Sequence, residues 1–255
     1  MAVDEAVLKE TGLGLVPPTL RLYAWEPACL SLGYAQPTSD VDIESLASYG
    51  WQLVRRPTGG RAILHTDELT YSVIGPQEEP RLAGGVLESY QMLSKALLRA
   101  IQMLSVPAQS SPHPGAHDPN GNKGPVCFEV PSNYEITVNG KKLVGSAQAR
   151  RREGVLQHGS LPLYGDLTRI TRALCFPDEQ ARLRASERLL ERATTLESVL
   201  GYRIKWEQVA QALITAFSEA LNLELVPSDL LPEELEMAED LVVIKYANPE
   251  WTEKV

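Results

Sequence analysis

The spacing of apolar residues along the chain switches between strand-like and helical patterns, and no internal repeat is visible. Residues 1–11, which end at Gly12, and residues 86–104, where apolar side chains recur every three or four positions, predict helices. Short runs rich in branched and aromatic residues predict strands at residues 20–25, 29–34, 51–55 and 69–75. Strands and helices are therefore mixed in the first hundred or so residues.

Residues 105–125 interrupt this pattern, because they are rich in Pro, Gly, Ser and Asn. We expect no regular element there, and a segment of this length in a compact domain is either disordered or a functional lid. Strands resume after it, at residues 133–139, 142–147 and 154–164. The dipeptide Asn139-Gly140, which separates the first two of these strands, predicts a tight hairpin turn.

Helical spacing dominates after about residue 178, at residues 178–190, 206–217 and 235–246. Mixed elements followed by helices predict an α+β domain with a small C-terminal element that begins between residues 176 and 200. The balance of basic and acidic residues also changes near this place in the chain. Residues 1–175 hold 16 basic and 17 acidic side chains, whereas residues 176–255 hold 8 and 16.

The net charge of −9 argues against a nucleic-acid binder. Two segments depart from this acidity, because residues 55–61 and 141–152 contain 8 of the 24 basic residues and no acid. A charge run is often only solvated surface. Two acid-free basic segments in an acidic chain nevertheless favour an anionic ligand or partner.

The three cysteines, Cys29, Cys127 and Cys175, are widely separated and show no C-x-x-C spacing, so they predict neither a disulfide framework nor a zinc site. We expect a reducing, cytoplasmic environment and no metal. The first residues lack the basic and apolar segments of a leader, and no stretch approaches the roughly 20 apolar residues that span a bilayer. We therefore expect no membrane association.

Several common catalytic signatures are missing from the sequence. It contains no G-x-x-x-x-G-K phosphate-binding loop, no G-x-S-x-G nucleophile elbow and no H-E-x-x-H zinc motif. A P-loop nucleotidase, a serine hydrolase with a standard elbow and a zinc peptidase are therefore unsupported.

The segment from Arg55 to His65 reads Arg-Arg-Pro-Thr-Gly-Gly-Arg-Ala-Ile-Leu-His and follows a predicted strand. Paired glycines let a backbone approach a ligand closely, and the flanking arginines suit an acidic or phosphate-bearing group. A plain hairpin turn is the alternative.

A second segment, Gly140 to Gln148, reads Gly-Lys-Lys-Leu-Val-Gly-Ser-Ala-Gln. Small residues at 145–147 would let a thin ligand lie against the backbone. Strand alternation predicts that Lys142 points inward while Lys141 points out, and a buried ammonium needs a polar or anionic partner. The alternative is a surface hairpin with two solvated lysines.

Cys127 lies at the end of the irregular segment, fifteen residues before Lys142. A nearby ammonium favours the thiolate, the nucleophilic form of cysteine, so this pair suggests acyl transfer through a thioester. For Cys29 and Cys175 we expect the commoner state of a buried, inert thiol.

Taken together, these segments resemble the lipoyl/octanoyl transferase and lipoate–protein ligase superfamily, and within it the LipM-type octanoyltransferases most closely. The similarity covers nearly the whole chain. It is carried by the Arg55–His65 segment with Glu-Leu-Thr-Tyr-Ser after it, by Cys127-Phe128 with Pro-Ser and Tyr-Glu, by the Gly140–Gln148 segment and by Leu-Gln-His-Gly-Ser at 156–160.

The resemblance implies a biotin/lipoate-ligase-like α+β fold with a mixed, mostly antiparallel sheet flanked by helices. We therefore expect a catalytic domain at residues 1–200 and a small, acidic, mainly helical extension packed on it at residues 201–255. It also implies transfer of octanoate from octanoyl acyl carrier protein to the enzyme cysteine, and then to a lysine of a lipoyl domain such as glycine cleavage H protein. Neither ATP nor magnesium is expected, and a monomer is.

Carried over position by position, the resemblance implies that Cys127 holds the acyl group and that Lys142 lowers the pKa of its thiol and orients the thioester carbonyl. The Gly59-Gly60 turn and residues 145–147 would line a tunnel for the acyl chain and the pantetheine arm. The full set of matching substrate-binding positions is Arg55, Arg56, Thr58, Gly59, Gly60, Arg61, His65, Gly145, Ser146, Ala147, Gln148, His158 and Gly159. The two histidines match motif positions without an assigned role. Arg55, Arg56 and the Arg150–Arg152 run are expected to help dock acidic carrier proteins.

Three alternatives remain open. An ATP- and magnesium-dependent lipoate–protein ligase usually has a third glycine where this chain has Arg61, an aspartate where it has Thr66, and no cysteine near 127. An octanoyl amidotransferase between two carrier proteins generally has Pro where this chain has Phe128. A non-catalytic carrier-binding module would leave Cys127 no more reactive toward alkylation than Cys29 or Cys175.

Overall fold

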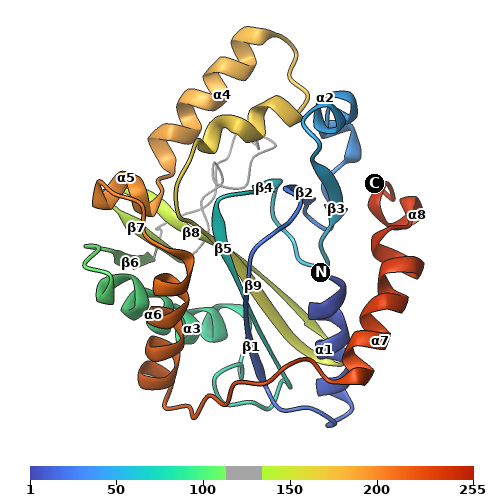
Figure 1. The fold of residues 1–255 in the computed structure, drawn as a ribbon, viewed down its shortest axis with the longest axis vertical. Helices are drawn as coiled ribbons and strands as arrows, with labels where there is room; N and C mark the ends of the chain where they lie inside the picture. Colours follow the sequence, from blue (N-terminus) through green and yellow to red (C-terminus); the bar gives the residue numbers. More distant parts are fainter. Residues whose placement is uncertain (113–133) are drawn as a thin grey trace.

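A computed structural model of the chain describes residues 1–112 and 134–255, and Figure 1 shows their arrangement. The centre is a six-stranded sheet with the strand order β1-β5-β9-β8-β7-β6, in which all neighbouring strands run antiparallel. A smaller sheet has the order β3-β2-β4, with β2 and β3 parallel and β2 and β4 antiparallel. The predicted α+β class with a mostly antiparallel sheet is confirmed.

The strands of the large sheet are β1 (Thr19–Tyr23), β5 (Glu68–Gly75), β6 (Gln109–Pro112), β7 (Tyr134–Val138), β8 (Lys141–Arg151) and β9 (Gly154–Pro162). Those of the small sheet are β2 (Cys29–Leu32), β3 (Gln52–Arg55) and β4 (Ile63–His65). The α-helices are α1 (Ala2–Gly12), α2 (Ile43–Ser48), α3 (Val86–Met103), α4 (Glu179–Arg192), α5 (Leu196–Leu200), α6 (Trp206–Leu221), α7 (Pro232–Leu241) and α8 (Pro249–Thr252). Shorter helical turns lie at Thr38–Asp40, Leu167–Ala173 and Val242–Tyr246.

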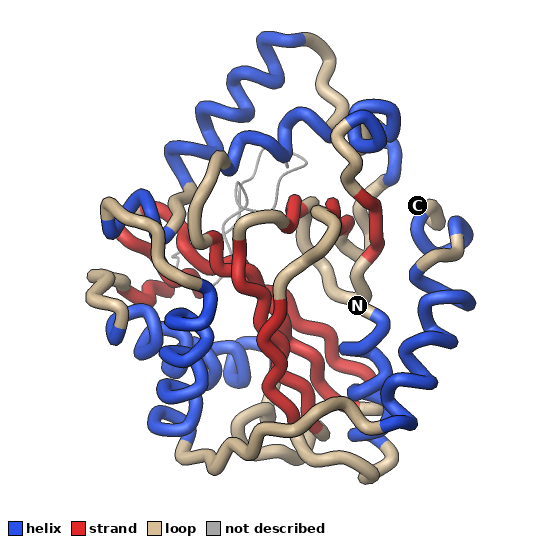
Figure 2. Tube along the Cα trace, in the orientation of Figure 1, coloured by secondary structure: helices blue, strands red, loops and turns tan. Residues whose placement is uncertain are grey.

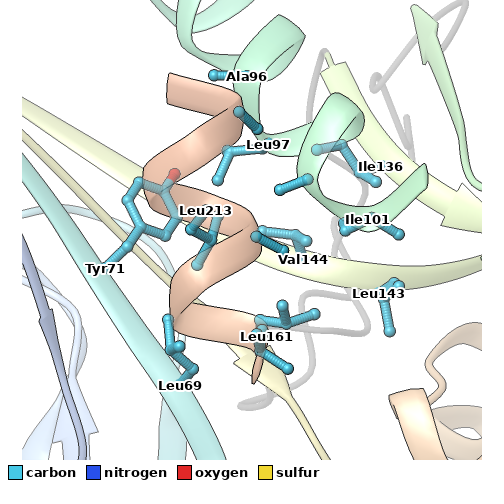
Figure 3. Close-up of a cluster of buried hydrophobic side chains, with 14 of the residues drawn as sticks. Leu69, Tyr71, Ala96, Leu97, Ile101, Ile136, Leu143, Val144, Leu161 and Leu213 are labelled. Carbon is cyan, nitrogen blue, oxygen red and sulfur yellow. The ribbon is translucent and has the colours of Figure 1, made fainter. Parts of the chain in front are cut away.

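The two faces of the large sheet have different cover. Helices α3 and α6 pack together on one face, where their apolar sides and the sheet form the largest core cluster (Figure 3). Tyr71 and Leu213 are labelled members of that cluster. Helix α1 lies against β5 and β9 on the other face. Figure 2 shows the helices flanking the strands on both sides.

Residues 201–255, expected to form one small extension packed on the catalytic domain, divide between two places. Helix α6 belongs to the main core, to which it contributes Val209, Leu213 and Phe217. Helix α7 instead packs against α1, and α8 lies against β3 (Figure 1). The boundary near residue 200 stays a prediction, while the packing of these helices on the rest of the chain is a property of the structure.

Most predicted elements are present, with ends shifted by a few residues. Asn139 and Gly140 have φ angles of 50° and 77°, which is the left-handed pair that a two-residue hairpin turn requires. One expectation is wrong: residues 109–112 are not irregular but form β6, which pairs with β7. Serines and a proline in an edge strand carry little strand signal, because only one side of such a strand must pair.

No helix within the described residues is both long enough and apolar enough to cross a membrane. Cys127 and the predicted irregular segment from residue 113 onward lie outside those residues.

Candidate functional site

A cavity opens between the two sheets and collects most of the predicted site. Strands β8 and β9 contribute one wall and the small sheet contributes the other. About 390 Å³ of this space is unoccupied by protein atoms, part of it open to solvent. Its lining residues are Met1, Ser31, Arg56, Gly60, Ile63, His65, Thr70, Gly145, Ser146, Ala147, His158, Gly159 and Ser160.

The structure therefore brings together three sequence segments that are far apart in the chain. Of the predicted substrate-binding residues, those that line the cavity are Arg56, Gly60, His65, Gly145, Ser146, Ala147, His158 and Gly159. Arg55, Thr58, Gly59, Arg61 and Gln148 do not line it. The roles assigned to all of them by resemblance stay predictions.

Glycine is required at two points of this site for steric reasons. A Cβ on Gly159 would lie 2.6 Å from the carbonyl oxygen of Gly145 and from Ser146 Oγ, so β8 and β9 can approach here only with a bare backbone. Gly60 has a φ of 96°, a left-handed conformation that side chains rarely adopt. A Cβ added to Gly33 would lie 1.9 Å from the carbonyl oxygen of Gly60.

Lys142 lies on β8, three residues before Gly145, and is not among the residues that line the cavity. A register shift between β7 and β8 occurs at this point. The ammonium lies 3.0 Å from the Glu135 carboxylate, and only 5% of the residue is exposed. Lys141 instead donates to the carbonyl of Leu190 at 2.6 Å. The predicted orientation, with Lys142 inward and Lys141 outward, is confirmed, and so is its need for an anionic partner.

A buried chain of hydrogen bonds forms the small-sheet side of the cavity. His65 Nδ1 lies 2.6 Å from Glu68 Oε1, and His65 Nε2 lies 2.8 Å from Ser31 Oγ. Arg56 donates to Ser31 Oγ at 3.1 Å, and Ser160 donates to Glu68 at 2.9 Å. The chain is continuous from Arg56 through Ser31, His65 and Glu68 to Ser160. Buried polar groups on this wall are therefore paired with one another.

Glu68 is the ionised group in that chain of hydrogen bonds. Burial alone would raise the pKa of this carboxyl, but the charge of His65 and hydrogen bonds from His65, Thr70 and Ser160 outweigh burial and lower it. An ionised Glu68 accepts a hydrogen bond from His65 Nδ1–H, and His65 Nε2 lies within hydrogen-bond distance of the Ser31 hydroxyl. The His65 ring also stacks on Trp25, with 4.2 Å between ring centroids.

His158 lies on the opposite wall with a different environment. Its Nε2 is 2.6 Å from Thr58 Oγ1, whereas its Nδ1 is 3.9 Å from Asp4 Oδ2 and has no hydrogen-bond partner among the described residues. Burial lowers the pKa of His158, although Asp4 opposes that shift. The imidazole is therefore neutral near pH 7.

Asp4 anchors helix α1 to this wall. Its carboxylate accepts hydrogen bonds from Arg21, from Tyr23 at 2.9 Å and from Ser72 at 2.8 Å. Burial would raise the pKa of Asp4, but the nearby amino group of Met1, His158 and Arg21 together hold it well below its usual range. A charged carboxylate is thus held next to the cavity by several donors.

Arg55 is not exposed, so the expectation that it helps dock carrier proteins is wrong. The residue is fully buried, and its guanidinium donates to backbone carbonyls and to Thr38. The carbonyl acceptors are those of Gly33 at 2.8 Å, Tyr34 at 3.3 Å, Gln36 at 2.6 Å and Thr252 at 2.9 Å. Its charge therefore holds the end of β2 and helix α8 together.

Arg56 is buried too, at 3% exposed, but it borders the cavity. Its guanidinium donates to the carbonyls of Ser31 at 2.9 Å, Gly59 at 2.9 Å and Arg61 at 2.7 Å, and so shapes the glycine turn. It is also too buried to dock a carrier protein. Arg61 is only half-buried and lies 3.9 Å from Asp40.

The Arg150–Arg152 run is divided by strand alternation. Arg150 donates to the carbonyl of Leu82 at 3.1 Å on the face covered by α3, while Arg151 and Arg152 are exposed at the end of the β8–β9 hairpin. Gln148 shares the Arg150 face, where it bonds Ser89 at 3.0 Å and Gln157 at 2.9 Å. Its side chain therefore points away from the cavity, contrary to its predicted role as a ligand contact.

The two other cysteines differ from each other. Cys29 is buried, which raises the pKa of its thiol to about 12. Cys175 is exposed, so the expectation that it is buried is wrong, yet partial burial and the charges of Asp42 and Asp40 also raise its pKa. Neither thiol is activated.

Sequence reasoning missed Asp4, Ser31 and Glu68. A signal was present for Glu68, because polar residues at 68, 70 and 72 alternate with Leu69, Tyr71 and Val73 in one strand. Such alternation usually marks a solvated face, but here the polar face is buried under α1 and the small sheet. Within the described residues, no group of three or more His, Cys, Asp or Glu side chains could hold a metal ion.

The geometry is accompanied by clear similarity to known proteins. Residues 1–218 match the lipoyl protein ligase A/B catalytic domain. The chain belongs to this family of lipoyl transferases and ligases.

Among its relatives is the octanoyltransferase LipM of Kyrpidia tusciae, 44% identical over 98% of this chain and 92% of that protein. The octanoyltransferase LipM of Bacillus subtilis is 36% identical over the full chain and 93% of that protein. These relatives bear out the prediction of an acyltransferase that acts in protein lipoylation.

Solved structures agree on the fold. A bipartite lipoate protein ligase of Thermoplasma acidophilum, studied with its E2 lipoyl domain, superimposes with a TM-score of 0.80 at 25% identity, over 99% of this chain and 89% of that one. A lipoate-protein ligase A bound with ATP superimposes with a TM-score of 0.78 at 25% identity, over 99% and 92% of the two chains.

Proposed function

We propose that the protein takes an octanoyl group from octanoyl acyl carrier protein onto Cys127 and passes it to a lysine of a lipoyl domain, such as that of glycine cleavage H protein. The observation that carries this proposal is the cavity bordered by Gly145, Ala147 and Gly159, with the buried Lys142 ammonium just beyond it on the same strand. A bare backbone wall fits a thin alkyl chain, and the ammonium fits the polar carbonyl at its end.

In the first step, the Cys127 thiolate attacks the carbonyl carbon of the donor thioester. The carbonyl oxygen becomes an oxyanion, the carbon–sulfur bond to the donor breaks, and the donor leaves as a thiol after it takes up a proton. In the second step, the neutral amine of the acceptor lysine attacks the enzyme thioester, loses a proton, and releases the Cys127 thiol. Both steps exchange an already activated acyl group, so neither needs ATP or magnesium.

Lys142 suits both steps. A buried ammonium stabilises a thiolate before attack and an oxyanion after it, and its pairing with Glu135 at 3.0 Å fixes its position. The buried His65 and His158 side chains then help to exclude water from the acyl chain. We propose the cytoplasm as the site of action, because free thiols fit a reducing compartment, and we propose a monomer.

The test is to incubate the pure protein with octanoyl acyl carrier protein alone. Intact-mass analysis should show an adduct of about 126 Da at Cys127, as expected for acylation of a nucleophilic cysteine. Neutral hydroxylamine or an apo lipoyl domain should release it, and Cys127→Ser should not turn over at a useful rate.

A ligase would behave differently. If Cys127→Ala kept full activity with lipoate, ATP and magnesium, the transferase proposal would be wrong. Alkylation offers an independent check, because Cys127 should react faster than Cys29 or Cys175, whose pKa values are raised.

A further inference from the structure

A second cavity lies on the same face of the large sheet, farther along the β8–β9 hairpin. About 730 Å³ of its space is unoccupied by protein atoms, part of it open to solvent. Helix α1, the C-terminal helices and the ends of β8 and β9 enclose it. Its lining residues are Glu5, Leu8, Lys9, Tyr34, Pro57, Ala149, Arg151, Glu153, Leu156, Lys245 and Trp251.

The strand register places the two cavities one after the other along β8 and β9. The pairs Gly145↔Ser160 and Ala147↔His158 border the first cavity, and the next pair on the same face, Ala149↔Leu156, borders the second. Successive pairs on one face are about 7 Å apart along a strand. Lys142 precedes Gly145, so an acyl chain whose carbonyl lies near this ammonium would extend toward Ala147 and the second cavity.

A side-chain contact between Thr58 and His158 crosses this line. Thr58 Oγ1 lies 2.6 Å from His158 Nε2 and joins the glycine turn to β9. Thr58 is almost fully buried and lines neither cavity, whereas Arg56 before it lines the first and Pro57 lines the second. Tyr34 donates its backbone N–H to the Thr58 carbonyl at 2.9 Å, which holds the threonine in place.

We propose that the Thr58–His158 contact is the chain-length stop of the acyl site, and that the second cavity is a latent site for the distal carbons of straight-chain acyl thioesters longer than octanoyl. This inference rests on the proposed function. In the native protein the contact ends the first cavity beyond Ala147. Without the threonine side chain, the two cavities become one groove.

The chemistry of the second cavity suits this use. Part of its wall is apolar, formed by Leu8, Pro57, Ala149 and Leu156. Its cations have partners, because Lys245 pairs with Glu5 at 2.6 Å and Arg151 donates to the carbonyl of Pro57 at 3.4 Å. Methylene groups that pass the stop could therefore pack against the apolar part of the wall.

The experiment compares donors carrying octanoyl, decanoyl and dodecanoyl chains in single-turnover acylation of Cys127, read by intact mass. Wild-type protein should prefer octanoyl. Thr58→Ala should raise the dodecanoyl-to-octanoyl rate ratio at least about tenfold, the lower end of what one methylene is worth in an apolar pocket. Thr58→Val keeps the bulk without the hydroxyl and should raise the ratio much less.

A double variant supplies the control. Ala149→Leu in the Thr58→Ala background fills the start of the second cavity and should return the ratio to the wild-type value. Melting temperatures of all variants separate a changed ratio from partial unfolding. If the folded Thr58→Ala protein acylates with octanoyl but shows an unchanged ratio, the proposed stop is wrong. If the wild-type protein forms no octanoyl adduct, the proposed function itself fails.

Discussion

The two acid-free basic segments, residues 55–61 and 141–152, look alike in the sequence but have opposite uses in the structure. In the first, Arg55 and Arg56 are buried and donate to backbone carbonyls, so their charge organises the protein itself. In the second, Lys142 holds a buried charge beside the cavity, and Arg151 and Arg152 are exposed. A run of cations therefore does not by itself indicate a ligand. A cationic side chain is available to a ligand only if backbone carbonyls do not already accept its hydrogen bonds.

The largest effect is expected at Lys142. Lys142→Ala should nearly abolish transfer and slow alkylation of Cys127 at neutral pH, because the thiolate and the oxyanion lose their cation. Lys142→Arg should rescue poorly, since a planar guanidinium does not replace a compact ammonium. The measurements are single-turnover acylation and the alkylation rate. Lys141→Ala is the matched control, and a larger loss there than at Lys142 would reverse the assignment of the two lysines.

Arg55→Ala should act on stability. The substitution leaves several buried carbonyls without a donor, and each such group costs about 1–3 kcal/mol, so a loss of roughly 3 kcal/mol or more in the free energy of unfolding is expected. Urea denaturation measures it. Arg55→Lys should recover part of that loss, because an ammonium still offers donors. A change in unfolding free energy below about 1 kcal/mol would show that the carbonyls find other partners.

His158 gives a pH-dependent prediction at the point where the first segment meets β9. Burial lowers its pKa in the folded state, so below an ordinary value of 6.5 the unfolded chain binds the proton more readily. Stability should therefore fall as the pH drops below 6.5, by at most about 1.4 kcal/mol per pH unit from this group. His158→Gln should remove this contribution. Equal slopes for the two proteins between pH 6.5 and the lowered pKa would contradict the prediction.

The smallest effect is expected at the exposed end of the second segment. Replacing Arg151 and Arg152 by Ser should raise the KM for carrier proteins a few-fold and weaken its salt dependence, because exposed charges act over about 8 Å at physiological salt. Activity should be measured across a range of sodium chloride concentrations. Arg172→Ser, an exposed arginine on another surface, is the control. An unchanged salt profile would exclude the hairpin end from the docking surface.

The sequence predicted the fold class, most strands and the grouping of the cavity residues, because those features depend on local periodicity and on motif positions. It could not predict the burial of Arg55. That burial depends on four backbone carbonyls that accept from one guanidinium, those of Gly33, Tyr34, Gln36 and Thr252. No local sequence pattern predicts such an arrangement. The same reason hid Asp4, whose partners Arg21, Tyr23 and Ser72 lie on β1 and β5.

The junction between Arg55 and helix α8 also has a consequence for biosynthesis. Arg55 donates to the carbonyl of Thr252, and Trp251 donates its indole N–H to the carbonyl of Arg55 at 2.9 Å. The two partners are separated by 197 residues in the first of these bonds. A ribosome makes the small sheet early, but the guanidinium and the carbonyl of Arg55 lack these two partners until residues 251 and 252 emerge. The small sheet therefore reaches its final hydrogen bonding only after helix α8 has been made.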